Sequence, residues 1–218
     1  MSYKNFTANI LQSDVQFLKD MGLESHHKIL DVGCAGGRLG YELINYLDKD
    51  GYYGFDKETK WIESFRLSVL ATGLSNGKNP TIELGDFTTS FPDIKFDYVY
   101  AYSLFTHIDP PLVTQFFDNF KDNIVKETKI FATLTVLEGE GWEIRGGRHE
   151  ARKNEFAGVY YSLDFFNNLI EKSGYRIVTD NVKEHYPTSL EIVGPLSDHG
   201  FTLDGTGTHR MILMEKIE

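Results

Sequence analysis

Short apolar runs alternate along the chain with segments whose apolar residues recur every three or four positions. Such runs predict strands buried on both faces of a sheet, because a half-buried strand alternates apolar and polar residues instead. Seven runs of this kind are found, at 28–33, 51–56, 81–86, 96–103, 129–137, 175–182 and 209–217.

The segments between these runs predict helices. Helical spacing of apolar residues covers 39–47, 61–73, 110–124 and 162–174, and a further helix is expected between Leu11 and Met21, ahead of the first strand. Ser162 is placed to cap the last of these helices, and Gly174 can end it in a left-handed conformation.

Strands that alternate with helices favour right-handed crossovers and a parallel sheet covered on both faces. The last two runs break this rule, because no helical pattern separates them. The predicted fold is therefore α/β, with a Rossmann-like, doubly wound, mostly parallel seven-stranded sheet that ends in an antiparallel C-terminal hairpin.

A length of 218 residues suits one domain, which we expect to span 1–218. Within it, residues 1–24 are expected to form an N-terminal helix or lid. Residues 138–161 show no regular pattern and are long for a connector, so we expect an irregular insertion that contributes to the substrate site.

Composition narrows the class of protein. The formal net charge of −10 makes nucleic acid and acidic membrane surfaces unfavourable partners. A single cysteine, Cys34, cannot form a disulfide within the chain or a Cys-rich zinc site. No secretory signal pattern and no run of about eighteen apolar residues is found, so a soluble, cytoplasmic protein is expected.

The stretch DVGCAGG, at the end of the first predicted strand, marks a ligand site. Small residues let a ligand lie against bare backbone, and amides that enter a following helix attract an anionic group. In an open α/β sheet, ligands bind at the carboxyl ends of the strands. The glycines do not match the G-x-G-x-x-G spacing of dinucleotide-binding proteins.

On this stretch the chain resembles the class I S-adenosylmethionine-dependent methyltransferases, whose first motif is acid-x-Gly-x-Gly-x-Gly. The matching residues here are Asp31, Gly33, Ala35 and Gly37, with alanine in place of the middle glycine. The resemblance implies that Asp31 holds the amino end of the cofactor and that the backbone around Cys34 lies against it.

Three later motifs extend the resemblance. Asp56, followed by Lys57, closes the second predicted strand, where the family binds the ribose hydroxyls. Asp86, with Phe87 beside it, follows the third strand, where the family binds the adenine amino group. The stretch YAYSLFTHI, which contains Tyr102 and Ser103, is similar to the motif that faces the methionine part of S-adenosylmethionine.

Each of these residues also has a purely structural interpretation. Asp31 could bond loop amides, and Asp56 and Asp86 could form turns after their strands. Cys34 fits a small buried filler better than a reactive thiol. The joint placement of the acids at strand ends favours the cofactor interpretation.

Two histidines are candidate bases for a protonated acceptor. His107 follows the fourth strand, near where the methyl donor is expected, and His149 is the second choice. A packing or capping role for His107 is the alternative. No histidine spacing typical of a metal site is found, so no metal is expected.

The resemblance implies methyl transfer from S-adenosylmethionine to a small molecule, and we expect a hydroxyl acceptor on a sugar or secondary metabolite. A protein or tRNA methyltransferase is one alternative, and a non-catalytic S-adenosylmethionine-binding regulatory module is another. The sequence does not indicate an oligomeric state.

Overall fold

The computed structural model describes residues 14–86, 93–148, 155–180 and 207–217. Contacts between residues divide the chain into two compact units. Unit 1 takes in residues 1–100 and 119–129, and unit 2 takes in residues 101–118 and 130–218. A single methyltransferase domain across 1–218 stays a prediction.

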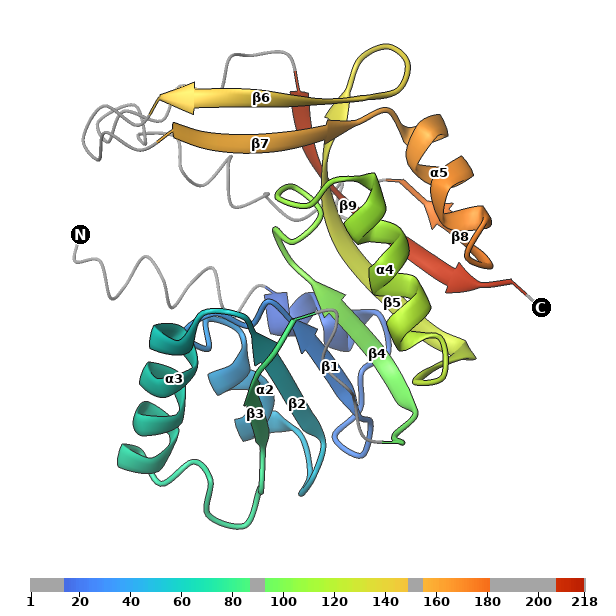
Figure 1. Cartoon of the computed structure of the whole chain (residues 1–218). Coiled ribbons are helices and arrows are strands. Elements are labelled where there is room, and N and C mark those ends of the chain that lie inside the picture. Colours follow the sequence, from blue (N-terminus) through green and yellow to red (C-terminus); the bar gives the residue numbers. More distant parts are fainter. Residues whose placement is uncertain (1–13, 87–92, 149–154, 181–206, 218) are drawn as a thin grey trace. The chain divides into compact units, whose positions relative to one another are not determined.

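Unit 1 is built on a parallel sheet, whose strands lie side by side in Figure 1. Its strands are β1 (Ile29–Val32), β2 (Tyr52–Asp56), β3 (Thr81–Leu84) and β4 (Phe96–Ala101), in the order β3-β2-β1-β4. The pairs β1/β2, β1/β4 and β2/β3 are all parallel. Their carboxyl ends therefore lie at one edge, as the sequence predicted.

Three helical segments accompany this sheet: residues 14–20, α2 (Gly40–Tyr46) and α3 (Thr59–Ala71). The predicted stripe of α3 is buried, with Ile62, Phe65 and Val69 facing inward. Residues 14–20 confirm part of the helix predicted ahead of the first strand, and residues 1–13 lie outside the described residues.

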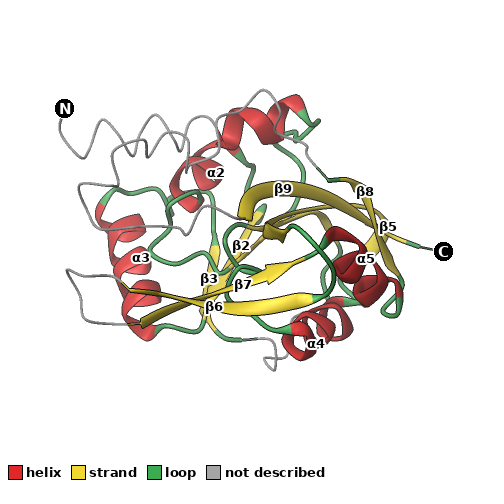
Figure 2. Cartoon of the chain, turned by 90° about the horizontal axis from the view of Figure 1, so that it is seen from above, coloured by secondary structure: helices red, strands yellow, loops and turns green. Residues whose placement is uncertain are grey.

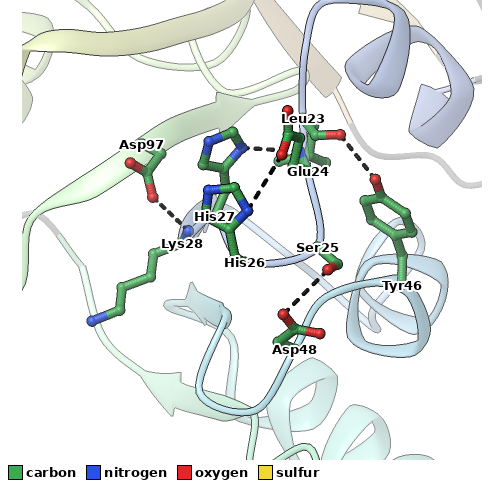
Figure 3. Close-up of polar contacts among 9 residues, drawn as sticks. All are labelled: Leu23, Glu24, Ser25, His26, His27, Lys28, Tyr46, Asp48 and Asp97. Atoms are coloured by element: carbon green, nitrogen blue, oxygen red, sulfur yellow. Dashed lines mark hydrogen bonds and ion pairs between the residues drawn. The ribbon is translucent and has the colours of Figure 1, made fainter.

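The loop before β1 is held by polar contacts at the amino end of the sheet (Figure 3). The Lys28 N–H donates to an Asp97 carboxylate oxygen at 2.7 Å, and the Glu24 N–H donates to His27 Nδ1 at 2.9 Å. The Tyr46 hydroxyl donates to the Leu23 carbonyl at 3.0 Å. These contacts fix where β1 begins, at the end of the strand opposite to the predicted site.

Unit 2 contains most of α4 (Pro110–Phe120) and β5 (Ile124–Leu137), followed by four strands and one helix. These are β6 (Trp142–Arg148), β7 (Glu155–Tyr161), α5 (Leu163–Glu171), β8 (Tyr175–Thr179) and β9 (Gly207–Lys216). The pair β8/β9 is antiparallel, which confirms the predicted C-terminal hairpin, and β9 also pairs antiparallel with β5. As predicted, Ser162 caps α5, accepting the Phe165 N–H at 3.3 Å.

The prediction of an irregular segment at 138–161 is wrong for residues 142–148 and 155–161, which form strands, whereas residues 149–154 lie outside the described residues. Strands β6 and β7 pair antiparallel from Trp142↔Tyr161 to Arg148↔Glu155, and Figure 2 shows them side by side. Strand β7 also pairs parallel with the end of β5, at Thr135↔Tyr160 and Val136↔Tyr161. This pairing with a buried strand supplies hydrogen bonds and packing that the glycine-rich, charged sequence does not reveal.

An aromatic core in unit 2 fixes the segment that follows β4. The Phe105 ring, fully buried, packs against the rings of Phe116 and Phe166 at centroid distances of 5.3 and 5.5 Å. The Tyr161 hydroxyl donates to the Ile108 carbonyl at 2.5 Å. Residues 102–108 are therefore anchored on both sides of His107.

The fold class is confirmed: a mixed α/β sheet with mainly parallel strands in its first half and an antiparallel hairpin at its end. The described residues form nine strands instead of the predicted seven, because β6 and β7 were not expected. No helix in the described part of the chain is both long enough and apolar enough to cross a membrane.

Candidate functional site

The glycine-containing loop after β1 turns sharply. The N–H groups of Gly33 and Cys34 both donate to the Phe55 carbonyl, at 2.9 and 3.1 Å. Gly33, Ala35 and Gly37 have positive φ angles of 73°, 47° and 83°. Because a residue with a side chain rarely adopts such an angle, Ala35 carries local strain. Strain of this kind in a loop at a strand end is typical of ligand sites.

Asp56 ties the glycine-containing loop to the start of α3. One carboxylate oxygen accepts the Ala35 N–H at 3.0 Å, and the other accepts the Glu58 N–H at 2.9 Å. The Glu58 contact is the turn-forming role considered as the structural alternative. Each carboxylate oxygen can accept a second donor, and Asp56 is only half-buried. The two loop contacts thus fix the orientation of the Asp56 carboxylate, and both of its oxygens can still accept a hydrogen bond from a ligand.

Asp31 is buried beside Tyr52. Its carboxylate accepts the Tyr52 hydroxyl at 2.8 Å, and its side chain is 4% exposed. Burial raises the pKa of Asp31 to about 6, although the Tyr52 hydrogen bond and the Arg38 charge oppose the rise. The charged form of Asp31 is therefore incompletely compensated, which suits a carboxylate that receives a cation from a ligand.

The N-terminal helix reaches the same region through an ion pair. The Arg38 guanidinium, which follows the glycine-containing loop, lies 3.0 Å from the Asp14 carboxylate. Asp14 is 2% exposed, so this ion pair offsets part of the cost of burying its carboxylate. The predicted helix ahead of β1 is thus attached to the segment that leads into α2.

Asp86 lies two residues past β3, at the same edge as Asp56. The strand register places Asp56 opposite Leu84, and the Gly85 N–H donates to the Asp56 carbonyl at 3.0 Å. Asp86 and Lys57 are exposed, and Phe87 lies outside the described residues. The structure therefore brings the acids of the three strand ends to one edge, as the sequence predicted.

Packing within the protein also requires small residues in the glycine-containing loop. A Cβ added at Gly37 would lie 2.3 Å from Phe65 ring carbons, and one at Gly40 would meet the same ring at 2.3 Å. A Cβ at Gly36 would lie 3.3 Å from the half-exposed Trp61 ring. Room for a ligand is thus not the whole explanation, since α3 packs directly onto the loop.

Cys34 is a buried free thiol, 4% exposed. Burial raises the pKa of this thiol well above its usual range, and the charges of Asp31 and Asp56 act in the same direction. This environment disfavours the reactive thiolate. It agrees with the interpretation of Cys34 as a small buried filler.

Within unit 2, Ser103 and His107 come together in the turn after β4. The Ser103 hydroxyl oxygen lies 3.5 Å from His107 Nε2, and His107 is exposed. Ser103 has a positive φ of 57°. Tyr102, the other residue predicted to face the methionine part, is partly buried. The structure leaves the roles of all three as predictions.

The second candidate base, His149, lies outside the described residues. Nearby on β6, Arg145 forms an ion pair with Glu143, and its guanidinium lies 4.7 Å from the centre of the Tyr160 ring. Among the residues that the structure describes, no group of three or more His, Cys, Asp or Glu side chains could hold a metal ion.

Three contributors to the site were not predicted: Tyr52, Phe65 and the Asp14–Arg38 pair. Tyr52 carries a signal that could have been used, because a tyrosine in a fully buried strand needs a partner for its hydroxyl. Phe65 was expected only as core. Asp14 and Arg38 are 24 residues apart, and nothing in their local sequence pairs them.

Comparison with known proteins gives consistent matches. Residues 29–126 match a family model described as a methyltransferase domain. Phosphoethanolamine N-methyltransferase 1 of Arabidopsis thaliana is 34% identical over 110 residues, which are 49% of this chain and 21% of that protein. The chain thus spans about a fifth of the length of this curated relative.

Solved structures share the fold across nearly the whole chain. The glycopeptide N-methyltransferase MtfA, in complex with S-adenosyl-L-methionine, has a TM-score of 0.67 at 13% identity, covering 94% of this chain and 92% of that one. A SAM-dependent methyltransferase of Methanosarcina mazei has a TM-score of 0.66 at 16% identity, covering 92% and 96%. At this identity the likeness establishes the arrangement of helices and strands.

Proposed function

We propose that the chain is a class I S-adenosylmethionine-dependent methyltransferase that transfers a methyl group from S-adenosylmethionine to a small-molecule acceptor. The bound donor supplies a methyl group activated by a positively charged sulfur. The residues of the chain have to bind the donor, orient the acceptor and accept its proton.

One observation carries the proposal: the Asp56 carboxylate is fixed between the Ala35 and Glu58 amides, and both oxygens keep acceptor capacity. A carboxylate held in this way can accept two neighbouring hydroxyl groups, such as those of a ribose. S-adenosylmethionine also fits the described residues at Asp31. The charge of this buried carboxylate is incompletely compensated, which suits the ammonium group of the methionine part.

The remaining cofactor contacts follow from the resemblance. Asp86, with Phe87, is proposed to bind the adenine, and Lys57 is proposed to lie beside the ribose. Tyr102 and Ser103 are proposed to face the methionine part. The loop backbone would contribute the rest, from Gly33, Cys34, Ala35 and Gly37.

We propose a small molecule with a protonated nucleophile as the acceptor, and a sugar or secondary-metabolite hydroxyl as its first candidate. An amine is the second candidate, since two of the relatives with named acceptors, the phosphoethanolamine and glycopeptide enzymes, are N-methyltransferases. Both acceptors lose a proton during transfer. The exposed imidazole of His107 is the proposed base, since it can take that proton near neutral pH.

Asp56→Ala is expected to abolish binding of S-adenosylmethionine. At one hundred times its dissociation constant, the cofactor adds about 2.7 kcal/mol to the wild-type protein, which raises Tm by about 5 to 10 °C for a chain of this length. Thermal unfolding with and without S-adenosylmethionine measures this shift. Asp56→Asn, which retains one acceptor oxygen, separates loss of charge from loss of the loop contacts. An undiminished shift in the alanine variant contradicts the assigned role.

A labelled-methyl assay identifies the acceptor class. S-adenosylmethionine with a labelled methyl group is incubated with phosphoethanolamine, ethanolamine, phenols and sugars, and in parallel with protein and tRNA fractions. Label in a small molecule is expected, as a methyl ether for the first candidate and as an N-methylated amine for the second. Label only in protein or tRNA overturns the small-molecule proposal, and cofactor binding without any incorporation favours a regulatory module.

A further inference from the structure

The side chain of Tyr52 reaches from β2 to Asp31 on β1. In this parallel pair of strands, Asp31 lies opposite Gly54, and Tyr52 lies opposite Ile29. Because side chains two residues apart point to the same face of a strand, Tyr52 and position 54 share one face of the sheet. Gly54 has no side chain there, and the Tyr52 hydroxyl uses this space to donate to Asp31 Oδ2 at 2.8 Å.

Two glycines enclose the Tyr52 hydroxyl. A Cβ added at Gly54 would lie 2.6 Å from the hydroxyl oxygen, and one added at Gly40, the first residue of α2, would lie 2.5 Å from it. The Phe65 ring of α3 packs edge-on against the Tyr52 ring, at a centroid distance of 6.0 Å. These close neighbours fix the position of the hydroxyl, with the Asp31 carboxylate as its acceptor.

The direction of this hydrogen bond is unambiguous when Asp31 is charged, because an ionised carboxylate can only accept. Burial raises the pKa of Tyr52 well above its usual value, and the negative charge of Asp31 acts in the same direction, so the hydroxyl keeps its hydrogen. The two oxygens of a carboxylate accept about four hydrogen bonds in total. Asp31 therefore retains acceptor capacity while Tyr52 holds one of its oxygens.

We propose that Tyr52 is a positioning residue, whose hydroxyl orients the Asp31 carboxylate and keeps it charged for the ammonium group of S-adenosylmethionine. The inference rests on the proposed function, in which Asp31 binds that group, and the effect of Tyr52 passes through Asp31. A hydrogen bond to the charged form of a carboxylate favours that form. Because the phenol is neutral, it does so without supplying a positive charge that would compete with the ligand.

The charged groups around Asp31 show why a neutral donor matters. Burial raises the pKa of Asp31 to about 6, and the charges of Asp56 and Asp14 act in the same direction. The Tyr52 hydrogen bond opposes this rise more strongly than the Arg38 charge does. Arg38 lies 3.0 Å from the Asp14 carboxylate, so its positive charge is shared with a second acid. Tyr52 therefore contributes more than Arg38 to keeping Asp31 ionised near neutral pH.

The pH dependence of cofactor binding tests the inference. Calorimetric titration with S-adenosylhomocysteine from pH 5 to pH 7 covers the range in which Asp31 gains a proton while the amino group of the ligand stays protonated. In the wild type, the affinity is expected to fall as the pH drops through about 6. In Tyr52→Phe, which keeps the ring, the midpoint of this fall is expected at higher pH. The affinity of the variant at pH 7 is expected to be about three- to tenfold lower than that of the wild type.

Two further variants separate positioning from a general loss of structure. Tyr46→Phe is the matched control: it removes a hydroxyl that donates to the Leu23 carbonyl at the amino end of the sheet, and it is expected to keep the wild-type midpoint. Gly54→Ala, whose Cβ would displace the Tyr52 hydroxyl, is expected to raise the midpoint as Tyr52→Phe does. Added to Tyr52→Phe, it should cause no further rise, because the hydroxyl is already absent.

The same pH midpoint in the wild type and in Tyr52→Phe overturns the inference, even if the variant binds less tightly, because any loss of packing can weaken binding at every pH. A wild-type affinity that does not fall between pH 7 and pH 5 also overturns it, since Asp31 then does not bind the ammonium group. Both results leave the proposed function standing, because the cofactor still binds. Failure of the wild type to bind S-adenosylhomocysteine at any pH removes the proposed function and this inference together.

Discussion

Asp31→Asn is expected to stabilise the unliganded protein at pH 8 and to weaken its binding of S-adenosylmethionine. Burial raises the pKa of the Asp31 carboxyl to about 6, against the opposing effects of the Tyr52 hydroxyl and the Arg38 charge. An uncharged asparagine avoids the penalty of burying a carboxylate, and its side-chain oxygen can still accept the Tyr52 hydroxyl.

The direction of the pH dependence follows from proton binding. In the unfolded chain the pKa of Asp31 is near 3.8, so between about pH 4 and pH 6 the folded protein holds a proton that the unfolded chain has released. The stabilisation from this proton is complete below pH 4 and is lost as the pH rises through 6. The two pKa values differ by an amount equivalent to about 3 kcal/mol, of which on the order of 1 kcal/mol is lost between pH 5 and pH 8.

Urea unfolding of the wild type and of Asp31→Asn, from pH 5 to pH 8, measures this effect. From pH 5 to pH 8, the free energy of unfolding of the wild type is expected to fall by about 1 kcal/mol relative to that of the variant. Tyr52→Phe is the matched variant: it keeps the ring, removes the hydrogen bond that lowers the pKa of Asp31, and should steepen the pH dependence. Parallel curves for wild type and Asp31→Asn contradict the prediction.

Asp31→Asn is also expected to bind S-adenosylmethionine more weakly. If Asp31 bonds the ammonium group of the cofactor, removal of its charge costs about 1.5 to 3 kcal/mol, or roughly 10- to 100-fold in Kd. Calorimetric titration with S-adenosylmethionine at pH 8 measures it. A variant that is more stable and binds equally well would assign Asp31 to the loop alone. A gain in stability with a loss in affinity is what a carboxylate kept for a ligand predicts.

The strands and their acids could be predicted because both depend on local pattern. Continuous apolar runs identified β1 and β2, and the acid at the end of each run followed from its position, as with Asp31 and Asp56. Parallel pairing then brings those ends to one edge without further information. The family motifs depend on the same positions, so the sequence alone was enough to propose where the cofactor binds.

The hairpin β6/β7 could not be predicted in the same way. Trp142 and Ile144 do alternate with polar residues, but both are exposed, so their pattern does not mark a buried face. The strands are stabilised by their pairing with each other and with the end of β5. A strand whose stability comes from its neighbours has a weak signal in its own residues.

The backbone conformations of two residues could not be predicted from the sequence either. Ala35 and Ser103 have positive φ angles, which neither residue type favours, and their conformations are imposed by Asp56 and by Thr133. The role of Gly37 was predicted only in part. Open backbone for a ligand explains a small residue there, but contact with Phe65 became visible only once α3 was placed.

Gly37→Ala separates these two reasons, and it is expected to lower the free energy of unfolding by about 2 to 4 kcal/mol. The positive φ of 83° accounts for about 1 kcal/mol of this loss, and the overlap of the new Cβ with the Phe65 ring, at 2.3 Å, accounts for the rest. Gly77→Ala is the matched control, because its φ is 77° and nothing lies within 4 Å of an added Cβ. Only the conformational part, about 1 kcal/mol, is expected there.

Urea unfolding of both variants measures the difference, and a double variant assigns it to one contact. Phe65 is fully buried, so Phe65→Leu alone destabilises the protein, but in combination with Gly37→Ala it also removes the ring atoms that the new methyl group overlaps. The double variant should therefore be more stable than the sum of the single losses predicts, by an amount on the usual scale of about 0.5 to 3 kcal/mol for residues in contact. Equal losses for Gly37→Ala and Gly77→Ala, or strict additivity with Phe65→Leu, would mean that the loop yields to the methyl group, and that the glycine is required by the ligand rather than by α3.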